Sequence, residues 1–342
     1  MVFHFHIKEA DELNHPTPLG LTFNEKAQEL RTLYMQSNFE MGISSIGRGY
    51  QLKQFVSTFQ GLRVLKLSGL RMSEVPWSIG NQLEQLRYLD LCGNNFRELP
   101  NSICRLYKLQ TLRLEGCKEF EEWPTSSVMT KMVNLRHLEL GLDPSIKYMP
   151  LGLGQLSSLQ TLGCFIVGNG EPDLLRGLFP RRRKEMINKD MIGGGLGELH
   201  GLNQLGGELA IKELRNVKDV RDAKEANLKL KSELQSLTLS WSSGHSWTRV
   251  LSVADEEQVL EDLQPHPNLK ALKIEWYEGF KMSSWMIYSS SLLPNLVELT
   301  LWSCSNLYYL PLIGEFPCLR RLCLKKLDAL KSIYNIVFVT EG

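Results

Sequence analysis

Features typical of membrane and secreted proteins are missing from this sequence. No run approaches the ~20 consecutive apolar residues that a membrane-spanning helix needs. The start of the chain has neither the charged lead-in nor the long apolar stretch of a secretory signal, and no Asn-x-Ser/Thr glycosylation acceptor occurs. These absences predict a cytoplasmic protein without a membrane span.

The motifs of enzymes and of metal or nucleotide sites are missing as well. The seven cysteines form no C-x-x-C pair and no Cys/His spacing of a zinc site, and His4 and His6 lack a third ligand. Glu198 stands where a G-x-G-x-x-G motif starting at Gly193 requires glycine, and neither a P-loop, a nucleophile elbow nor H-E-x-x-H occurs. We therefore predict no catalytic residue, no metal and no cofactor, and we do not expect an enzyme.

A charge imbalance is also lacking. Lys and Arg number 39 against 38 Asp and Glu, so the formal net charge is +1. The overall charge thus gives no argument for nucleic acid or a membrane surface as partner. The basic run Arg181–Lys184 is predicted to lie in a solvated loop rather than to dock on phosphate or an acidic partner.

Leucine, by contrast, recurs in a fixed phrase, Leu-x-x-Leu-x-Leu, which is cleanest at Leu86, Leu89 and Leu91. Clear copies begin at Leu62, Leu86, Leu109, Leu135, Leu234, Leu269, Leu296 and Leu319, and weaker copies begin at Leu30, Leu159 and Gly206. Most steps between copies lie within or near the roughly 20 to 29 residues of a leucine-rich repeat.

The phrase predicts a repeating strand. Because alternate side chains of a strand point to opposite faces, the second and third leucines point inward and their neighbours outward. Stacked units bury the apolar face that one unit cannot bury alone. We therefore predict an α/β leucine-rich-repeat solenoid, with a curved parallel β-sheet on the concave face and irregular or short helical returns on the convex side.

Spacing and composition divide the chain into four segments. These are an N-terminal capping unit at 1–29, a first repeat block at 30–164, a link at 165–205 and a second repeat block at 206–342. Residues 2–7 of the capping unit alternate apolar and polar residues as a strand does. The link lacks the leucine phrase and is rich in glycine, proline and basic residues.

Short helices are predicted on the return limbs. Val259, Leu260 and Leu263 share one face at helical spacing, which predicts a helix over 255–263, and 219–230 is predicted as another helical return. Prolines that follow an apolar residue, as in Leu99-Pro100, suit extended segments that do not pair as strands.

Several repeats have a polar or thiol residue at the same position, just after the predicted strand. Asn94, Cys117 and Cys304 each stand three residues after the last leucine of their phrase. Side chains at this position satisfy backbone groups where the chain leaves the strand, so we predict structural thiols rather than disulfides or metal ligands.

Several motifs together resemble one family. They are the Leu-Pro return limbs, Cys164-Phe-Ile-Val-Gly168, Leu196-Gly-Glu-Leu-His-Gly-Leu202, Gly207-Glu-Leu-Ala-Ile211, Leu263-Gln-Pro-His-Pro-Asn-Leu269, Ser283-Ser-Trp285 and Leu310-Pro-Leu-Ile-Gly-Glu-Phe-Pro317. As a set they resemble the leucine-rich-repeat region of plant intracellular nucleotide-binding disease-resistance proteins of the coiled-coil class. The resemblance implies recognition of pathogen molecules and restraint of an upstream nucleotide-binding switch, whose own domain this sequence does not contain.

Outward positions beside the inward leucines are the candidate partner-binding residues. In the first block they are Tyr88, Asp90, Arg113, Glu115, His137 and Glu139. In the second block they are Trp241, Lys273, Glu275, Trp276, Trp302, Arg321 and Lys325. We expect carboxylates such as Asp90, Glu115 and Glu139 to be solvated charges rather than acid/base groups.

Three of these candidates are tryptophans that follow consecutive strands, so we expect Trp241, Trp276 and Trp302 to lie near one another at the end of the sheet. Tryptophan is common in binding hot spots. The rings either form such a patch or pack on one another and cover the edge of the core.

The leading hypothesis is a protein-recognition module of plant innate immunity that binds a protein, with no nucleic acid partner. The partner would be a pathogen effector, a guarded host protein or a nucleotide-binding domain. The first alternative is a stand-alone scaffold or inhibitor that binds a host protein outside defence, and the second is a substrate-recruiting subunit.

Overall fold

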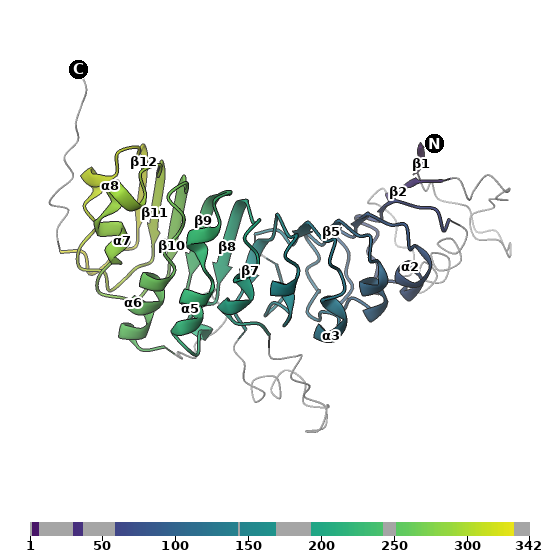
Figure 1. Ribbon diagram of the computed structural model, residues 1–342, viewed down its shortest axis with the longest axis horizontal. Coiled ribbons are helices and arrows are strands. Elements are labelled where there is room, and N and C mark those ends of the chain that lie inside the picture. The colour runs from purple at the N-terminus through teal and green to yellow at the C-terminus, as the bar shows by residue number, and fades with distance from the viewer. Residues whose placement is uncertain are drawn as a thin grey trace, which may run out of the picture. The chain divides into compact units, whose positions relative to one another are not determined.

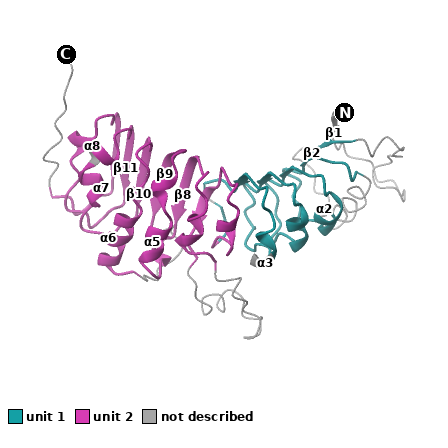
Figure 2. Ribbon diagram, viewed as in Figure 1, with its two compact units in different colours: residues 1–146 teal, residues 147–342 magenta. Residues whose placement is uncertain are grey.

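The computed structural model describes residues 2–6, 30–36, 59–142, 144–168, 193–241 and 251–331. The chain forms two compact units, unit 1 (residues 1–146) and unit 2 (residues 147–342) (Figure 2). Most of the predicted capping unit and much of the predicted link, including Arg181–Lys184, lie outside the described residues.

Each unit contains a parallel sheet in which consecutive strands of the chain are neighbours (Figure 1). The described strands of unit 1 are β1 (Val2–His6), β2 (Thr32–Gln36), β3 (Val64–Lys66), β4 (Tyr88–Asp90), β5 (Thr111–Arg113) and β6 (His137–Glu139). Those of unit 2 are β7 (Gly163–Ile166), β8 (Gly207–Lys212), β9 (Leu234–Ser240), β10 (Ala271–Glu275), β11 (Glu298–Trp302) and β12 (Arg321–Lys325). The strand of the repeat that begins at Leu159 thus belongs to unit 2.

The leucine phrase supplies the core of both units. The central leucines Leu65, Leu89 and Leu112 are fully buried and pair in register across β3, β4 and β5. The corresponding Leu272 and Leu299 pair in the same way between β10 and β11. The prediction of a leucine-rich-repeat solenoid with parallel strands is confirmed.

Short helices form much of the return limbs. In unit 1 they are α2 (Trp77–Gln82), the 3₁₀ helix η3 (Asn101–Arg105) and α3 (Ser126–Met129). In unit 2 they are η4 (Leu153–Gln155), η7 (Leu196–Leu199), η8 (Leu214–Asn216), α5 (Arg221–Glu225), η9 (Leu228–Leu230), α6 (Val253–Asp262), α7 (Ser284–Ile287), α8 (Ser289–Leu292) and η10 (Ile313–Glu315). The helix predicted over 255–263 is confirmed as α6, which begins with a capping box between Ser252 and Asp255. The return predicted over 219–230 contains two short helices, α5 and η9.

The closing position of the repeats has the predicted structural role. The buried Asn94 side chain donates from Nδ2 to the carbonyl oxygens of Leu67 and Leu91, at 2.8 and 2.7 Å, and its Oδ1 accepts from the amide of Met72 at 3.1 Å. Cys117 Sγ donates to the carbonyl oxygen of Leu91 at 3.2 Å, and Cys304 is also buried. One side chain therefore ties the chain leaving a strand to the preceding repeat.

Candidate partner-binding surface

The outward residues of unit 1 form a ladder across the sheet. Strand pairing places Lys66 beside Asp90, Asp90 beside Arg113 and Arg113 beside Glu139. Neighbouring strands lie about 4.8 Å apart, so charges of opposite sign alternate within contact distance. The pattern favours pairing within the ladder.

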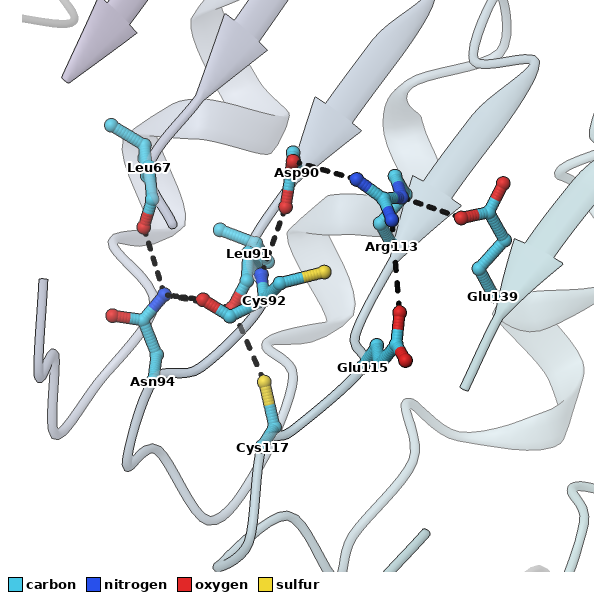
Figure 3. A network of polar contacts seen from close by, with 9 residues as sticks. All are labelled: Leu67, Asp90, Leu91, Cys92, Asn94, Arg113, Glu115, Cys117 and Glu139. Atoms are coloured by element: carbon cyan, nitrogen blue, oxygen red, sulfur yellow. Dashed lines mark hydrogen bonds and ion pairs between the residues drawn. The ribbon is translucent and has the colours of Figure 1, made fainter. Parts of the chain in front are cut away.

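Arg113 is the centre of this ladder (Figure 3). Its Nε donates to Glu139 Oε2 at 2.5 Å, its Nη1 lies 3.2 Å from Asp90 Oδ2, and its Nη2 lies 3.7 Å from Glu115 Oε2. The hydrogen bond to Glu139 raises the pKa of the guanidinium above its ordinary value. Three carboxylates thus surround one cation on the sheet surface.

Asp90 differs from the prediction of a solvated charge. It is 3% exposed, and its Oδ1 also accepts a hydrogen bond from the amide of Cys92 at 3.0 Å. The Arg113 side chain covers it, which strand alternation alone does not indicate. Asp90 therefore helps to hold the ladder together.

The other cation of the ladder, Lys66, contacts two aromatic rings. Lys66 Nζ lies 4.7 Å from the ring centre of Tyr34 and 5.4 Å from that of Tyr88, which are cation–π distances. Tyr88 and His137 are half-buried. The charged and aromatic side chains of the ladder are thus engaged with one another.

The outward face of unit 2 is built around Trp302 on β11. Lys273 Nζ from β10 lies 5.1 Å from the ring centre of Trp302 and 2.5 Å from Glu275 Oε1. Lys273 thereby pairs with Glu275, which is 9% exposed. The lysine side chain itself is 39% exposed and remains accessible.

Trp276 lies beside Trp302 and has an unusual backbone conformation. The two ring centres are 6.3 Å apart, and Trp276 is 36% exposed. Its φ angle of 59° lies in the left-handed region, which L-residues other than glycine, asparagine and aspartate rarely adopt. Residues held in such conformations cluster at binding and active sites.

Trp241 does not belong to this surface. It is fully buried and packs edge-on against Tyr277 at 4.9 Å between ring centres. Trp241 stands four residues after Leu237, an even step that strand alternation directs to the same inward face. Trp276 also follows its central leucine by four residues, but its left-handed backbone ends the strand geometry. The expected group of three tryptophans is therefore a pair.

The last described strand contributes two further candidates. Arg321 pairs with Glu298 of β11 across the sheet, and Lys325 is exposed at the end of β12. Lys325 aligns with Trp302 in the strand register. It extends the row that contains the tryptophan pair.

Three of the described thiols are poor nucleophiles. Burial is the main cause that raises the pKa values of Cys92, Cys104 and Cys304 to about 12, so they are protonated at neutral pH. Within the described ranges no cluster of three or more His, Cys, Asp or Glu side chains could hold a metal. No helix there is long and apolar enough to cross a membrane.

Sequence comparison agrees with the fold. Residues 60–118 match the leucine rich repeat family, and residues 196–327 match the R13L1/DRL21 leucine-rich repeats. The solved functional domain of InlJ from Listeria monocytogenes shares the fold, with a TM-score of 0.50, 13% identity and coverage of 90% of this chain and 62% of that one. The chain belongs to the leucine-rich-repeat proteins, a class generally used as an interaction scaffold.

Its relatives within this class are plant defence proteins. A putative disease resistance protein of Arabidopsis thaliana is 35% identical over 85% of this chain and 19% of its own length. Putative disease resistance protein RGA1 of Solanum bulbocastanum is 36% identical over 88% of this chain and 27% of its own length. Over most of its length the chain is homologous to plant disease resistance proteins, which confirms the resemblance, and it spans only a fifth to about a quarter of these two relatives.

Proposed function

We propose that this chain is a protein-recognition module of plant innate immunity, which senses a pathogen effector or guarded host protein, or restrains a nucleotide-binding switch, in the cytoplasm. The observation that carries the proposal is the exposed Trp276 in a left-handed backbone beside Trp302. Homology to disease resistance proteins supports the defence role.

The tryptophan pair offers the chemistry of a protein-binding hot spot. Trp276 and Trp302 present aromatic surface next to the accessible ammonium of Lys273. A partner that covers the rings would gain apolar burial and exclude water from the charge. The ladder around Arg113 offers less, because a partner would first have to break its ion pairs.

The binding site can be tested by affinity capture from healthy and infected plant tissue with the wild-type chain and with Trp276→Ala and Trp302→Ala. A hot-spot residue contributes about 2 kcal/mol, so each variant should bind the captured protein roughly 30-fold more weakly. Trp77→Ala is the matched control, because Trp77 is 53% exposed but begins α2 on a return limb of unit 1. Equal capture by all four proteins would refute the tryptophan site.

The defence role needs a separate measurement. Disrupting the gene should change pathogen growth or trigger defence without infection. Unchanged pathogen growth and unchanged defence markers, together with retained binding of a host protein, would favour a scaffold or inhibitor outside defence.

A further inference from the structure

A groove of about 690 Å³ opens at the edge of unit 2 where strands β9 to β12 begin. Its volume lies within the range of ligand sites in proteins. The strands run about five residues from this edge to the tryptophan pair, so the two features are roughly 15–20 Å apart along the sheet. The groove is therefore a separate feature of the surface.

One row of the groove crosses four repeats. The amide of Lys270 donates to the carbonyl oxygen of Gln235 at 2.9 Å, and the amide of Val297 donates to that of Lys270 at 2.8 Å. The amide of Arg320 donates in turn to the carbonyl oxygen of Val297 at 2.9 Å. Since each step is one strand spacing, Lys270 and Arg320 are about 10 Å apart with the apolar Val297 between them.

A second row lies two residues earlier in each repeat and contains Asn268, Asn295 and Cys318. The Nδ2 atoms of Asn268 and Asn295 donate to the carbonyl oxygens of Ser232 and Pro267, both at 3.2 Å. These bonds fix the two amide groups at the groove. Their carbonyl oxygens and the side chain of Gln235 then offer polar groups suited to a peptide backbone.

The two cations of the groove have no counter-ion of their own. Lys270 and Arg320 are exposed, and neither side chain has a hydrogen-bond or ion-pair partner among the described residues. Arg321, the next residue in the chain, differs in this respect, because it forms an ion pair with Glu298. The groove lining has two cations and three amides but no carboxylate.

We propose that this groove binds an extended, acidic peptide segment of a protein partner. Carboxylate side chains of the segment pair with Lys270 and Arg320, the amides take up its backbone groups, and Val297 contacts its apolar atoms. Single-stranded nucleic acid fits less well, because the lining contains no aromatic ring on which a base could stack.

The proposal is tested with the full chain and a short capped peptide that carries glutamate at alternate positions, compared with the same peptide carrying glutamine. We expect the glutamate peptide to bind, the glutamine peptide to bind at least about tenfold more weakly, and added salt to weaken binding. Lys270→Glu and Arg320→Glu should each lose at least about tenfold in affinity. Lys229→Glu, an exposed charge reversal on η9, should leave affinity unchanged.

Cys318 reports on the place of binding, because its thiol is exposed and lines the groove. The glutamate peptide should slow alkylation of Cys318, measured by mass spectrometry, while the buried Cys104 stays unmodified with or without peptide.

Equal binding of both peptides, unchanged affinity of the groove variants or unprotected Cys318 would each overturn the proposal. Tighter binding and stronger protection by an oligonucleotide would replace the peptide with a nucleic acid. Trp276→Ala should not affect any of these readouts, which separates this test from that of the tryptophan pair.

Discussion

In unit 1 the chain leaves three successive strands through Gly69, Gly93 and Gly116, whose φ angles are +70°, +66° and +73°. The corresponding left-handed position in unit 2, four residues after the central leucine, is taken by Glu213, Trp276, Ser303 and Lys326, with φ angles of 51–59°. Glycine adopts this conformation without the steric cost that a Cβ atom brings. At these three strand ends unit 1 avoids the strain of a left-handed side-chain-bearing residue, whereas unit 2 keeps side chains at the equivalent position, among them the candidate hot-spot residue.

Unit 2 also contains a buried cation whose hydrogen-bond acceptors are uncharged. In unit 1 the nearly buried Asp90 is paired with Arg113. In unit 2 the fully buried Lys231 Nζ bonds to the carbonyl oxygens of Leu199 and Leu202, at 2.7 and 3.2 Å, and to Asn203 Oδ1 at 3.4 Å, all uncharged groups. Together with the strained strand ends, this indicates that unit 2 departs further from an ideal repeat than unit 1.

The largest expected difference between the units concerns the closing side chain of the repeat. Asn94→Ala removes four hydrogen bonds of a fully buried side chain and leaves the carbonyl oxygens of Leu67 and Leu91 without that donor. The free energy of unfolding should fall by about 3 kcal/mol. Cys304→Ala in unit 2 loses two weak sulfur contacts, of 3.8 Å to the carbonyl oxygen of Ile274 and of 3.7 Å to that of Trp302, and should lower the free energy of unfolding by about 1 kcal/mol.

Urea unfolding followed by circular dichroism measures both losses. Asn81→Ala is the control in unit 1, because it removes a single exposed hydrogen bond from Arg105 and should have an effect below about 0.5 kcal/mol. Equal losses for the Asn94 and Cys304 variants would contradict the prediction that the side chain at this position stabilises unit 1 more than unit 2.

The second prediction concerns the buried charge of unit 2. Burial lowers the pKa of Lys231 from 10.5 to about 8. Between these values the unfolded chain binds more protons than the folded one, so the penalty for burying the charge disappears as the pH rises. From pH 7 to pH 9.5 the wild type should gain about 2 kcal/mol of stability relative to Lys231→Met.

The measurement is urea unfolding of both proteins across this pH range. The Lys231 variant lacks the buried amine, so its pH dependence gives the contribution of all other titrating groups. Lys229→Met is the control, since Lys229 is exposed on the same short return and should show no such pH-dependent difference. If the free energies of unfolding of the wild type and the Lys231 variant differ by the same amount at every pH, the lysine is not desolvated.

Sequence periodicity was sufficient for the parts of the fold that repeat. The leucine phrase predicted the positions of β3 to β6 and β9 to β12, because strand alternation requires its inward residues to be buried. Helical spacing likewise predicted α6, where Val259 and Leu260 are buried. These features depend on the local sequence alone.

The candidate site was less predictable, because it depends on neighbouring repeats and on the backbone. Asp90 and Glu275 are buried carboxylates, and each pairs with a long cationic side chain, that of Arg113 or Lys273. The opposite orientations of Trp241 and Trp276 arise from different backbone conformations at the same repeat position. The glycines at this position of unit 1 were a signal for a left-handed corner, and comparison of the repeats at that position would have found it.

The prediction with the smallest expected effect exchanges residue types between the units at the left-handed strand ends. It therefore tests the comparison of these strand ends directly. Gly93→Ala should destabilise the protein by about 1 kcal/mol, because alanine resists a φ of +66° even though its Cβ would meet Gly69 only at an ordinary 3.7 Å. Lys326→Gly should instead stabilise it by about 0.5 kcal/mol, since relief of the left-handed conformation outweighs the added freedom of glycine in the unfolded chain. Gly314→Ala is the control, because its backbone is not left-handed and its Cβ would meet nothing within 4 Å. If Lys326→Gly lowers the urea midpoint as Gly93→Ala does, the strand ends of unit 2 carry no strain, and the conformation of Trp276 loses its value as a sign of function.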